Sequence, residues 1–210
     1  MDIEERKILK AAITAVGGYT PKTILSNKKL EKMVDTTDEW IKTRTGIKER
    51  RILDDPHKAT SYLAIKAAND LIFKNNIDAS TIDLVILATV TPDIHVAATA
   101  AYVASSIGAV NAFAYDLNAA CSGFLYGMSV AAAYIKSRRY KKILLIGADK
   151  MSSIVDYSDL NFDKALEHII DKVHICNLFI GSHNEESIIK ATKLLEVIMF
   201  LQISLVSSSM

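Results

Sequence analysis

The chain of 210 residues is long enough to bury a sizeable core, and its composition, 50% hydrophobic and 23% charged, is that of a globular protein. A net charge of +1 argues against a nucleic-acid partner, and no apolar stretch reaches the roughly 20 residues that a membrane-spanning helix needs. Two cysteines, Cys121 and Cys176, exclude a disulfide-rich scaffold and favour a reducing compartment, so we expect a cytoplasmic protein without a membrane partner.

The first fifty residues predict one strand and two helices. An apolar strand is expected over residues 8–16, and a short helix is expected to begin after Ser26 and to reach about residue 34. A second helix follows, in which Thr36 and Thr37 are candidate N-caps and Gly46 is suited to the left-handed conformation that ends a helix.

From residue 59 onward, helices and strands alternate. Apolar periodicity predicts helices over 59–75, 97–107 and 121–136, and strands over 84–90, 112–117 and 143–146. Because alternating strands and helices form β-α-β crossovers, the sequence predicts an α/β fold with a mainly parallel sheet covered by helices.

Cys121 follows the predicted strand over 112–117 and opens the next predicted helix. Ligands collect at the carboxyl ends of strands in open α/β sheets, and the N–H groups of a helix N-terminus stabilise a thiolate. The small neighbours Ala120, Ser122 and Gly123 would admit a substrate carbonyl, so Cys121 is a candidate nucleophile for acyl transfer. The alternative is a buried, inert cysteine in an alanine-rich core.

Trp40 and Arg44 lie four residues apart and therefore on one face of their helix. With Arg50 and Arg51 nearby, they could hold a nucleotide by stacking and by pairing with phosphates. The alternative is that Trp40 anchors the core and the arginines are solvated. No metal site is predicted, because the five histidines are scattered without ligand spacing.

Four motifs resemble, in their order and spacing, the N-terminal half of β-ketoacyl-acyl-carrier-protein synthase III, an enzyme family of the thiolase superfamily. The motifs are TDEWIKTRTGI, ATVTPD, DLNAACSGF and GADKMS, at residues 37–47, 88–93, 116–124 and 147–152. The resemblance implies a thiolase-like N-terminal half-domain over residues 1–159, truncated relative to the family and built on a mixed, mainly parallel sheet.

The resemblance also implies the chemistry. The family condenses an acyl-CoA primer, commonly acetyl-CoA, with malonyl-acyl carrier protein to start fatty-acid synthesis, and its members are dimers. By this resemblance Cys121 is the acyl-accepting nucleophile, Trp40 stacks on the CoA adenine, Arg44 meets the CoA phosphates and Thr36 makes a weaker contact near the adenine. Coenzyme A enters as part of a substrate, so no cofactor is expected.

The sequence departs from the family after residue 159. The family continues with a Gly-Asp-Gly motif and a second half that carries a catalytic histidine and a catalytic asparagine, and none of these motifs occurs here. We therefore expect reduced or lost condensing activity and an apolar face without its usual cover, which favours association of copies. The alternative function is that of a non-catalytic remnant that binds CoA or a full-length synthase.

Residues 160–210 are expected to form a separate α/β tail of helix, strand and helix. An amphipathic stretch covers 162–170, a strand-like stretch covers 173–180, and Ser182 is a candidate cap of the last helix. The segment from Val173 to Ser187 weakly resembles a strand-to-helix piece of proline dehydrogenases, which are flavin enzymes.

Overall fold

The computed structural model describes residues 10–155 and 202–207, and the chain divides into two compact units. One unit, called the sheet unit below, comprises Met1–Thr20, Asp55–Lys150 and Ile198–Met210. The other, called the small unit, comprises Pro21–Asp54 and Met151–Val197.

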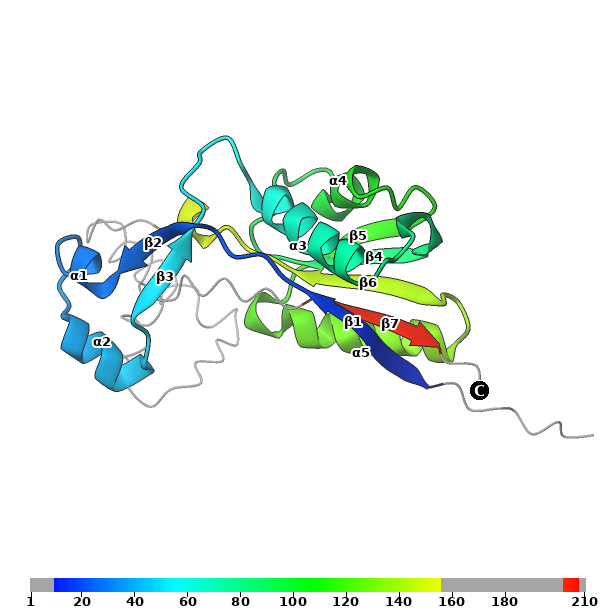
Figure 1. Ribbon diagram of the computed structural model, residues 1–210, viewed down its shortest axis with the longest axis horizontal. Coiled ribbons are helices and arrows are strands. Elements are labelled where there is room, and N and C mark those ends of the chain that lie inside the picture. The colour runs from blue at the N-terminus through cyan, green and yellow to red at the C-terminus, as the bar shows by residue number, and fades with distance from the viewer. Residues whose placement is uncertain (1–9, 156–201, 208–210) are drawn as a thin grey trace, which may run out of the picture. The chain divides into compact units, whose positions relative to one another are not determined.

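A five-stranded mixed sheet forms the centre of the sheet unit, with strand order β1-β7-β6-β4-β5 (Figure 1). The central strand β4 is parallel to β5 on one side and to β6 on the other, whereas β7 is antiparallel to both β6 and β1. The strands are β1 (Ala11–Gly17), β4 (Leu84–Ala88), β5 (Phe113–Leu117), β6 (Lys142–Gly147) and β7 (Gln202–Ser207).

Helices cover both faces of this sheet. They are α3 (Thr60–Lys74), α4 (Thr99–Ser106) and α5 (Gly123–Lys136), with short 3-10 turns η1 (Ala79–Thr81) and η2 (Ala120–Ser122). The chain moves from β4 outward to β5 through α4 and back across β4 to β6 through α5, so right-handed crossovers put α4 and α5 on opposite faces. Figure 1 shows α3 and α4 on one side of the sheet and α5 on the other.

The core lies against β4 and β6, whose central residues are buried on both faces. Toward α5, the strand residues pack with Ala131 and Ile135 in one cluster completed by Leu84, Ile86, Ile143 and Leu145. The phenol of Tyr115 packs against this cluster, and burial raises its pKa to about 12. A continuous apolar run such as residues 84–88 is typical of a strand covered by helices on both sides.

The small unit contains an antiparallel pair of strands and two short helices. Strand β2 (Thr23–Ser26) pairs with β3 (Glu49–Ile52), and α1 (Asn27–Leu30), α2 (Asp38–Thr45) and the 3-10 turn η3 (Met151–Ser153) complete it. Two caps agree with the sequence prediction: Thr37 Oγ1 accepts the N–H of Trp40, and Gly46 ends α2 with a φ of 72°.

The predicted α/β class and the alternation of helices and strands from residue 59 are confirmed, with ends shifted by one or two residues. The prediction that the first helix reaches residue 34 is wrong, because α1 ends at Leu30, after which Lys32 and Met33 donate to carbonyls three residues back and form a tight turn. The pairing of β2 with β3 and the strand β7 were not predicted. The helices and the strand predicted within residues 160–201 lie outside the described residues, and the division at residue 159 stays a prediction.

Candidate active site

Cys121 lies in the turn between β5 and α5, and its side chain is exposed. It therefore stands at the carboxyl end of a parallel strand and just before the N-terminus of a 14-residue helix. The alternative of a cysteine buried in the core is wrong, because this turn leaves the thiol at the surface of the described structure. Its role as a nucleophile stays a prediction.

The residue before Cys121 has an unusual backbone. Ala120 has a φ of 45°, in the left-handed region that residues with a Cβ adopt at a cost of about 1 to 2 kcal/mol. On the far side of the turn, Gly123 is buried, and a Cβ added there would meet the Cβ of Ala88 at 3.4 Å, an ordinary contact. The turn thus joins the end of the sheet to the start of α5 through one residue in a left-handed conformation.

Two aspartates that sequence reasoning missed organise the loops at this edge of the sheet. Asp116 accepts the backbone N–H groups of Thr99 and Ala100, at the N-terminus of α4, at 2.8 and 2.7 Å. Asp149 accepts three hydrogen bonds from the loop after β4, from Thr89 Oγ1, Val90 N and Thr91 Oγ1. Their one signal in the sequence is a carboxylate placed at or just after the end of a predicted strand.

Lys150 fastens the same edge to the start of α3. Its side chain is 9% exposed, and its ammonium donates to the backbone carbonyls of Asp55 and Lys58 at 2.9 and 2.6 Å. Its own N–H donates to the hydroxyl of Thr91 at 2.9 Å. Buried charges require such partners, so Lys150 has a structural reason for its position in the GADKMS motif.

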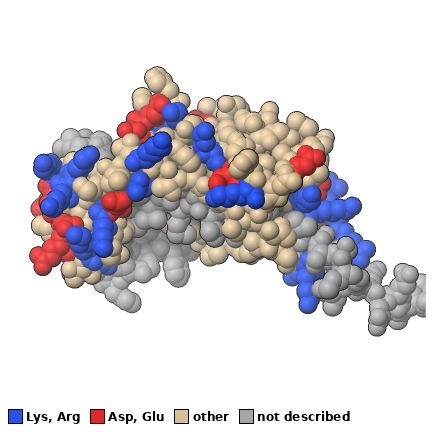
Figure 2. Space-filling view, in the orientation of Figure 1, with Lys and Arg blue, Asp and Glu red and all other residues tan. Residues whose placement is uncertain are grey.

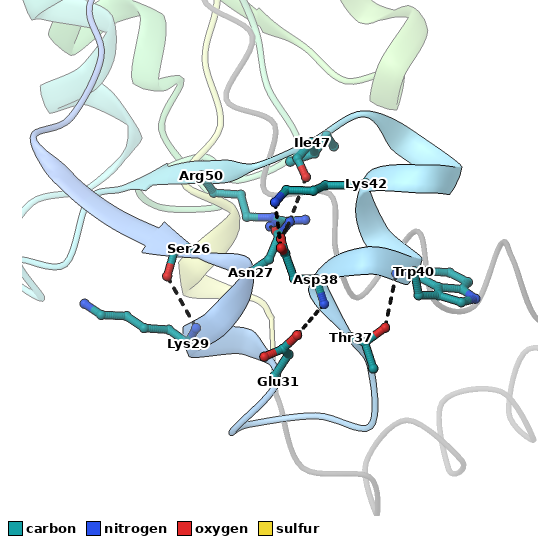
Figure 3. A network of polar contacts seen from close by, with 10 residues as sticks. All are labelled: Ser26, Asn27, Lys29, Glu31, Thr37, Asp38, Trp40, Lys42, Ile47 and Arg50. Atoms are coloured by element: carbon teal, nitrogen blue, oxygen red, sulfur yellow. Dashed lines mark hydrogen bonds and ion pairs between the residues drawn. The ribbon is translucent and has the colours of Figure 1, made fainter.

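The residues predicted to bind CoA lie in the small unit, in and just before α2. The guanidinium of Arg44 lies 5.6 Å from the centroid of the Trp40 ring, which confirms that the two side chains share one face. Trp40 packs in part on the buried pair Leu30 and Ile41, while Arg44 is exposed. In Figure 3 the Trp40 ring points away from the polar contacts of α1 and α2.

Beside α2, a buried polar network ties the small unit together (Figure 3). The amide of Asn27 donates to Asp38 and to the carbonyl of Ile47, both at 2.8 Å, and it accepts a hydrogen bond from Arg50. Hydrogen bonds from Lys42 and then from Asn27 hold the pKa of Asp38 below its ordinary value.

Arg50 requires a correction. The sequence suggested an exposed cation available for phosphates or solvent, but Arg50 is only 3% exposed. Its position on β3 turns the guanidinium toward Asn27 on α1, which lies 23 residues away in the sequence. Arg51, the next residue, remains at the surface and pairs with Glu49 at 3.2 Å.

Thr36, the third residue predicted to contact CoA, precedes α2. Its Oγ1 is buried and has no hydrogen-bond partner within the described part of the chain. A buried hydroxyl without a partner is uncommon in folded proteins, and the contact of Thr36 with CoA stays a prediction.

Within residues 10–155 and 202–207, no group of three or more His, Cys, Asp or Glu side chains is arranged to hold a metal ion. The helices of the same ranges are too short or too polar to cross a membrane.

Comparison with known proteins shows which family the chain is similar to. The family model for 3-oxoacyl-[acyl-carrier-protein (ACP)] synthase III matches residues 115–166, which include Asp116 and Cys121. The β-ketoacyl-[acyl-carrier-protein] synthase III of Chlorobium chlorochromatii is 57% identical over 151 residues, 72% of this chain and 46% of that protein. The resemblance to synthase III is confirmed. A synthase III of Bacteroides thetaiotaomicron is 55% identical over the same share of this chain and 45% of its own length.

The fold agrees with that of solved synthase III structures. The 3-oxoacyl-[acyl-carrier-protein] synthase III of Aquifex aeolicus superimposes with a TM-score of 0.72 and 35% identity, covering 96% of this chain and 55% of that one. The thiolase-like fold is therefore confirmed. The chain spans about half the length of the synthase III relatives that it matches.

Proposed function

We propose that this chain accepts an acyl group from acyl-CoA on Cys121, as the first step of a condensation with malonyl-acyl carrier protein that initiates fatty-acid synthesis. The observation that carries the proposal is the exposed thiol at the turn between β5 and α5, inside the segment that the synthase III family matches. Acetyl-CoA is the primer that we propose.

In the acyl-transfer step the Cys121 thiolate attacks the thioester carbonyl and forms a tetrahedral oxyanion. The oxyanion collapses, the C–S bond to coenzyme A breaks, and CoA leaves as a thiolate while the acetyl group stays on Cys121. The N-terminus of α5 carries the positive end of a helix dipole, which stabilises both the attacking thiolate and the oxyanion.

The CoA moiety is proposed to bind on the small unit. Trp40 offers a ring for the adenine, and Arg44 beside it offers a cation for a phosphate. Thr36, whose buried Oγ1 has no partner within the described residues, is proposed to lie near the adenine. Residues 21–54 hold nine Lys or Arg against six Asp or Glu, a local excess of positive charge in a nearly neutral chain. Figure 2 shows charged side chains of both signs gathered over α1 and α2.

The assembly that we propose is a homo-oligomer, a dimer by analogy with synthase III. Strand β5 forms one edge of the described sheet, and an open edge pairs readily with a second chain. Thiols are kept reduced in the cytoplasm, where the proposal places the protein.

The test is a stoichiometric assay of CoA release. Purified chain is mixed with acetyl-CoA and with malonyl-acyl carrier protein, and free CoA and any 3-ketoacyl product are separated by chromatography. With acetyl-CoA alone we expect about one CoA released per chain, and none from Cys121→Ala. Release beyond one CoA per chain, together with a 3-ketoacyl product, is expected only where malonyl-acyl carrier protein takes the acetyl group and frees Cys121. CoA binding without release would contradict acyl transfer and would support the second candidate, a non-catalytic remnant that binds CoA.

A further inference from the structure

The end of β5 is held from two directions. The carboxylate of Asp116 accepts the N–H groups of Thr99 and Ala100, and the carbonyl of the next residue, Leu117, accepts the N–H of Thr89 at 3.1 Å. The N-cap residue of α4 is Ala98, which has no side-chain acceptor of its own. Asp116 therefore caps α4 from the neighbouring strand and fixes that strand to the helix.

A strained turn follows directly. Only residues 118–122 join the fixed end of β5 to Gly123, which is buried at the start of α5. Within these residues, Ala120 takes a φ of 45°. A non-glycine residue keeps a left-handed backbone only where its surroundings hold it there, so the turn depends on both of its ends.

We propose that Asp116 is a positioning residue for Cys121: by capping α4 it holds the end of β5, keeps Ala120 in its left-handed conformation and thereby sets the thiol at the N-terminus of α5. The inference rests on the proposed role of Cys121 as the acyl acceptor. Asp116 acts here through the backbone of the turn, and not by contact with the thiol or with a substrate.

The direction in which the reactivity of Cys121 changes distinguishes positioning by Asp116 from a direct effect of its charge. Removing a carboxylate near a thiol stabilises the thiolate, so an Asp116 that acted through its charge would make Cys121 more reactive when replaced by asparagine. Positioning predicts the opposite, because the released turn lets Ala120 relax and moves the thiol away from the helix N-terminus. Asparagine also offers one acceptor oxygen where the aspartate offers two.

The experiment compares Asp116→Asn with a matched control, Asp83→Asn. Asp83 also accepts two backbone N–H groups, those of Lys141 and Lys142 at 2.7 and 2.9 Å, but it does so beside the opposite ends of β4 and β6. Each folded variant is treated with iodoacetamide from about pH 6 to about pH 9, and the alkylated Cys121 peptide is measured against time.

We expect Asp116→Asn to slow alkylation of Cys121 roughly five- to tenfold across the pH range, and Asp83→Asn to change it by less than about twofold. An unchanged or faster rate in Asp116→Asn, or an equal loss in both variants, overturns the proposal. A structural role alone would lower the melting temperature of Asp116→Asn without slowing the alkylation of Cys121 beyond the rate in Asp83→Asn.

A second pair of variants keeps the proposal testable if Asp116→Asn does not fold. Glycine adopts the left-handed conformation freely and valine resists it, so Ala120→Gly should keep the native alkylation rate and Ala120→Val should lose about fivefold or more. Equal rates in the two variants contradict the proposal. Because alkylation needs no CoA, a failure here is distinct from a failure of Cys121 to accept an acetyl group.

Discussion

Gly127 allows α5 to approach the sheet, and replacing it with alanine tests how closely the two are packed. A Cβ added at Gly127 would lie 2.5 Å from Cδ1 of Leu145, whereas carbon atoms in contact are normally about 3.5 to 4.0 Å apart. Leu145 lies on β6 with no exposed surface and belongs to the cluster beneath α5, so its side chain can move away only by displacing other core residues.

Two effects oppose each other in Gly127→Ala. Alanine favours the helix by up to about 1 kcal/mol, while overpacking of a full core costs about 1 to 3 kcal/mol. We expect the overlap to dominate and the free energy of unfolding to fall by about 1 to 2 kcal/mol. For a chain of this length that corresponds to a melting temperature lower by roughly 3 to 6 °C.

The assay is thermal unfolding followed by circular dichroism, with Gly123→Ala as the control in the same helix. A Cβ at Gly123 meets its nearest neighbour at 3.4 Å, an ordinary contact, so that variant should melt within about 2 °C of the native chain. The double variant with Leu145→Ala should lose less stability than the sum of the single changes. A Gly127→Ala protein that melts at or above the native temperature would refute the packing of α5 against β6.

Three further predictions concern charge and binding. The Lys42 ammonium holds the pKa of Asp38 below its ordinary 3.8, so the stability that the ionised carboxylate adds to the fold is complete above about pH 4 and is lost as the pH falls through the folded-state pKa. Asp38→Asn should reduce this loss of stability in acid, measured by the fluorescence of Trp40 during unfolding. Burial raises the pKa of Tyr115 to about 12, so stability is lost as the pH rises from about 10 to about 12, and Tyr115→Phe should remove that loss in alkaline unfolding curves. Arg44→Ala should weaken CoA binding about tenfold in calorimetry, while Lys42→Ala should stay within about threefold.

Each of these predictions has a result that contradicts it. Parallel stability curves for native chain and Asp38→Asn between about pH 6 and about pH 2 would mean that the carboxylate gains nothing from its partners in the fold. Identical alkaline unfolding curves for the native chain and Tyr115→Phe would mean that burial does not raise the pKa of the Tyr115 phenol. Equal CoA affinities for the Arg44 and Lys42 variants would mean that Arg44 does not bind the CoA phosphates.

Local patterns in the sequence were sufficient for the long elements. The helices α3 and α5 have apolar residues at helical spacing, and β4 is a continuous apolar run, so their existence follows from periodicity alone. The caps at Thr37 and Gly46 were also predictable, because capping depends on residues within one turn of the helix end.

Features that depend on distant partners were not predictable in this way. Arg50 is buried because Asn27 accepts its hydrogen bond from a different element, and nothing within β3 indicates that partner. Strand β7 pairs with β1 and β6, which lie far from it in the chain. The role of Asp116 as a cap is of the same kind, since α4 lies 16 residues earlier and only the β4-α4-β5 crossover brings its N-terminus to the end of β5.

The central claim is that Cys121 accepts an acyl group, and locating a label from acetyl-CoA tests it most directly. Purified chain is incubated with radiolabelled acetyl-CoA, quenched in acid and digested, and the labelled peptide is identified by mass spectrometry. The account predicts acetyl label on Cys121 and none on Cys176, with the label abolished in Cys121→Ala. Folded protein that takes up no label, or that carries it equally on both cysteines, would contradict the account.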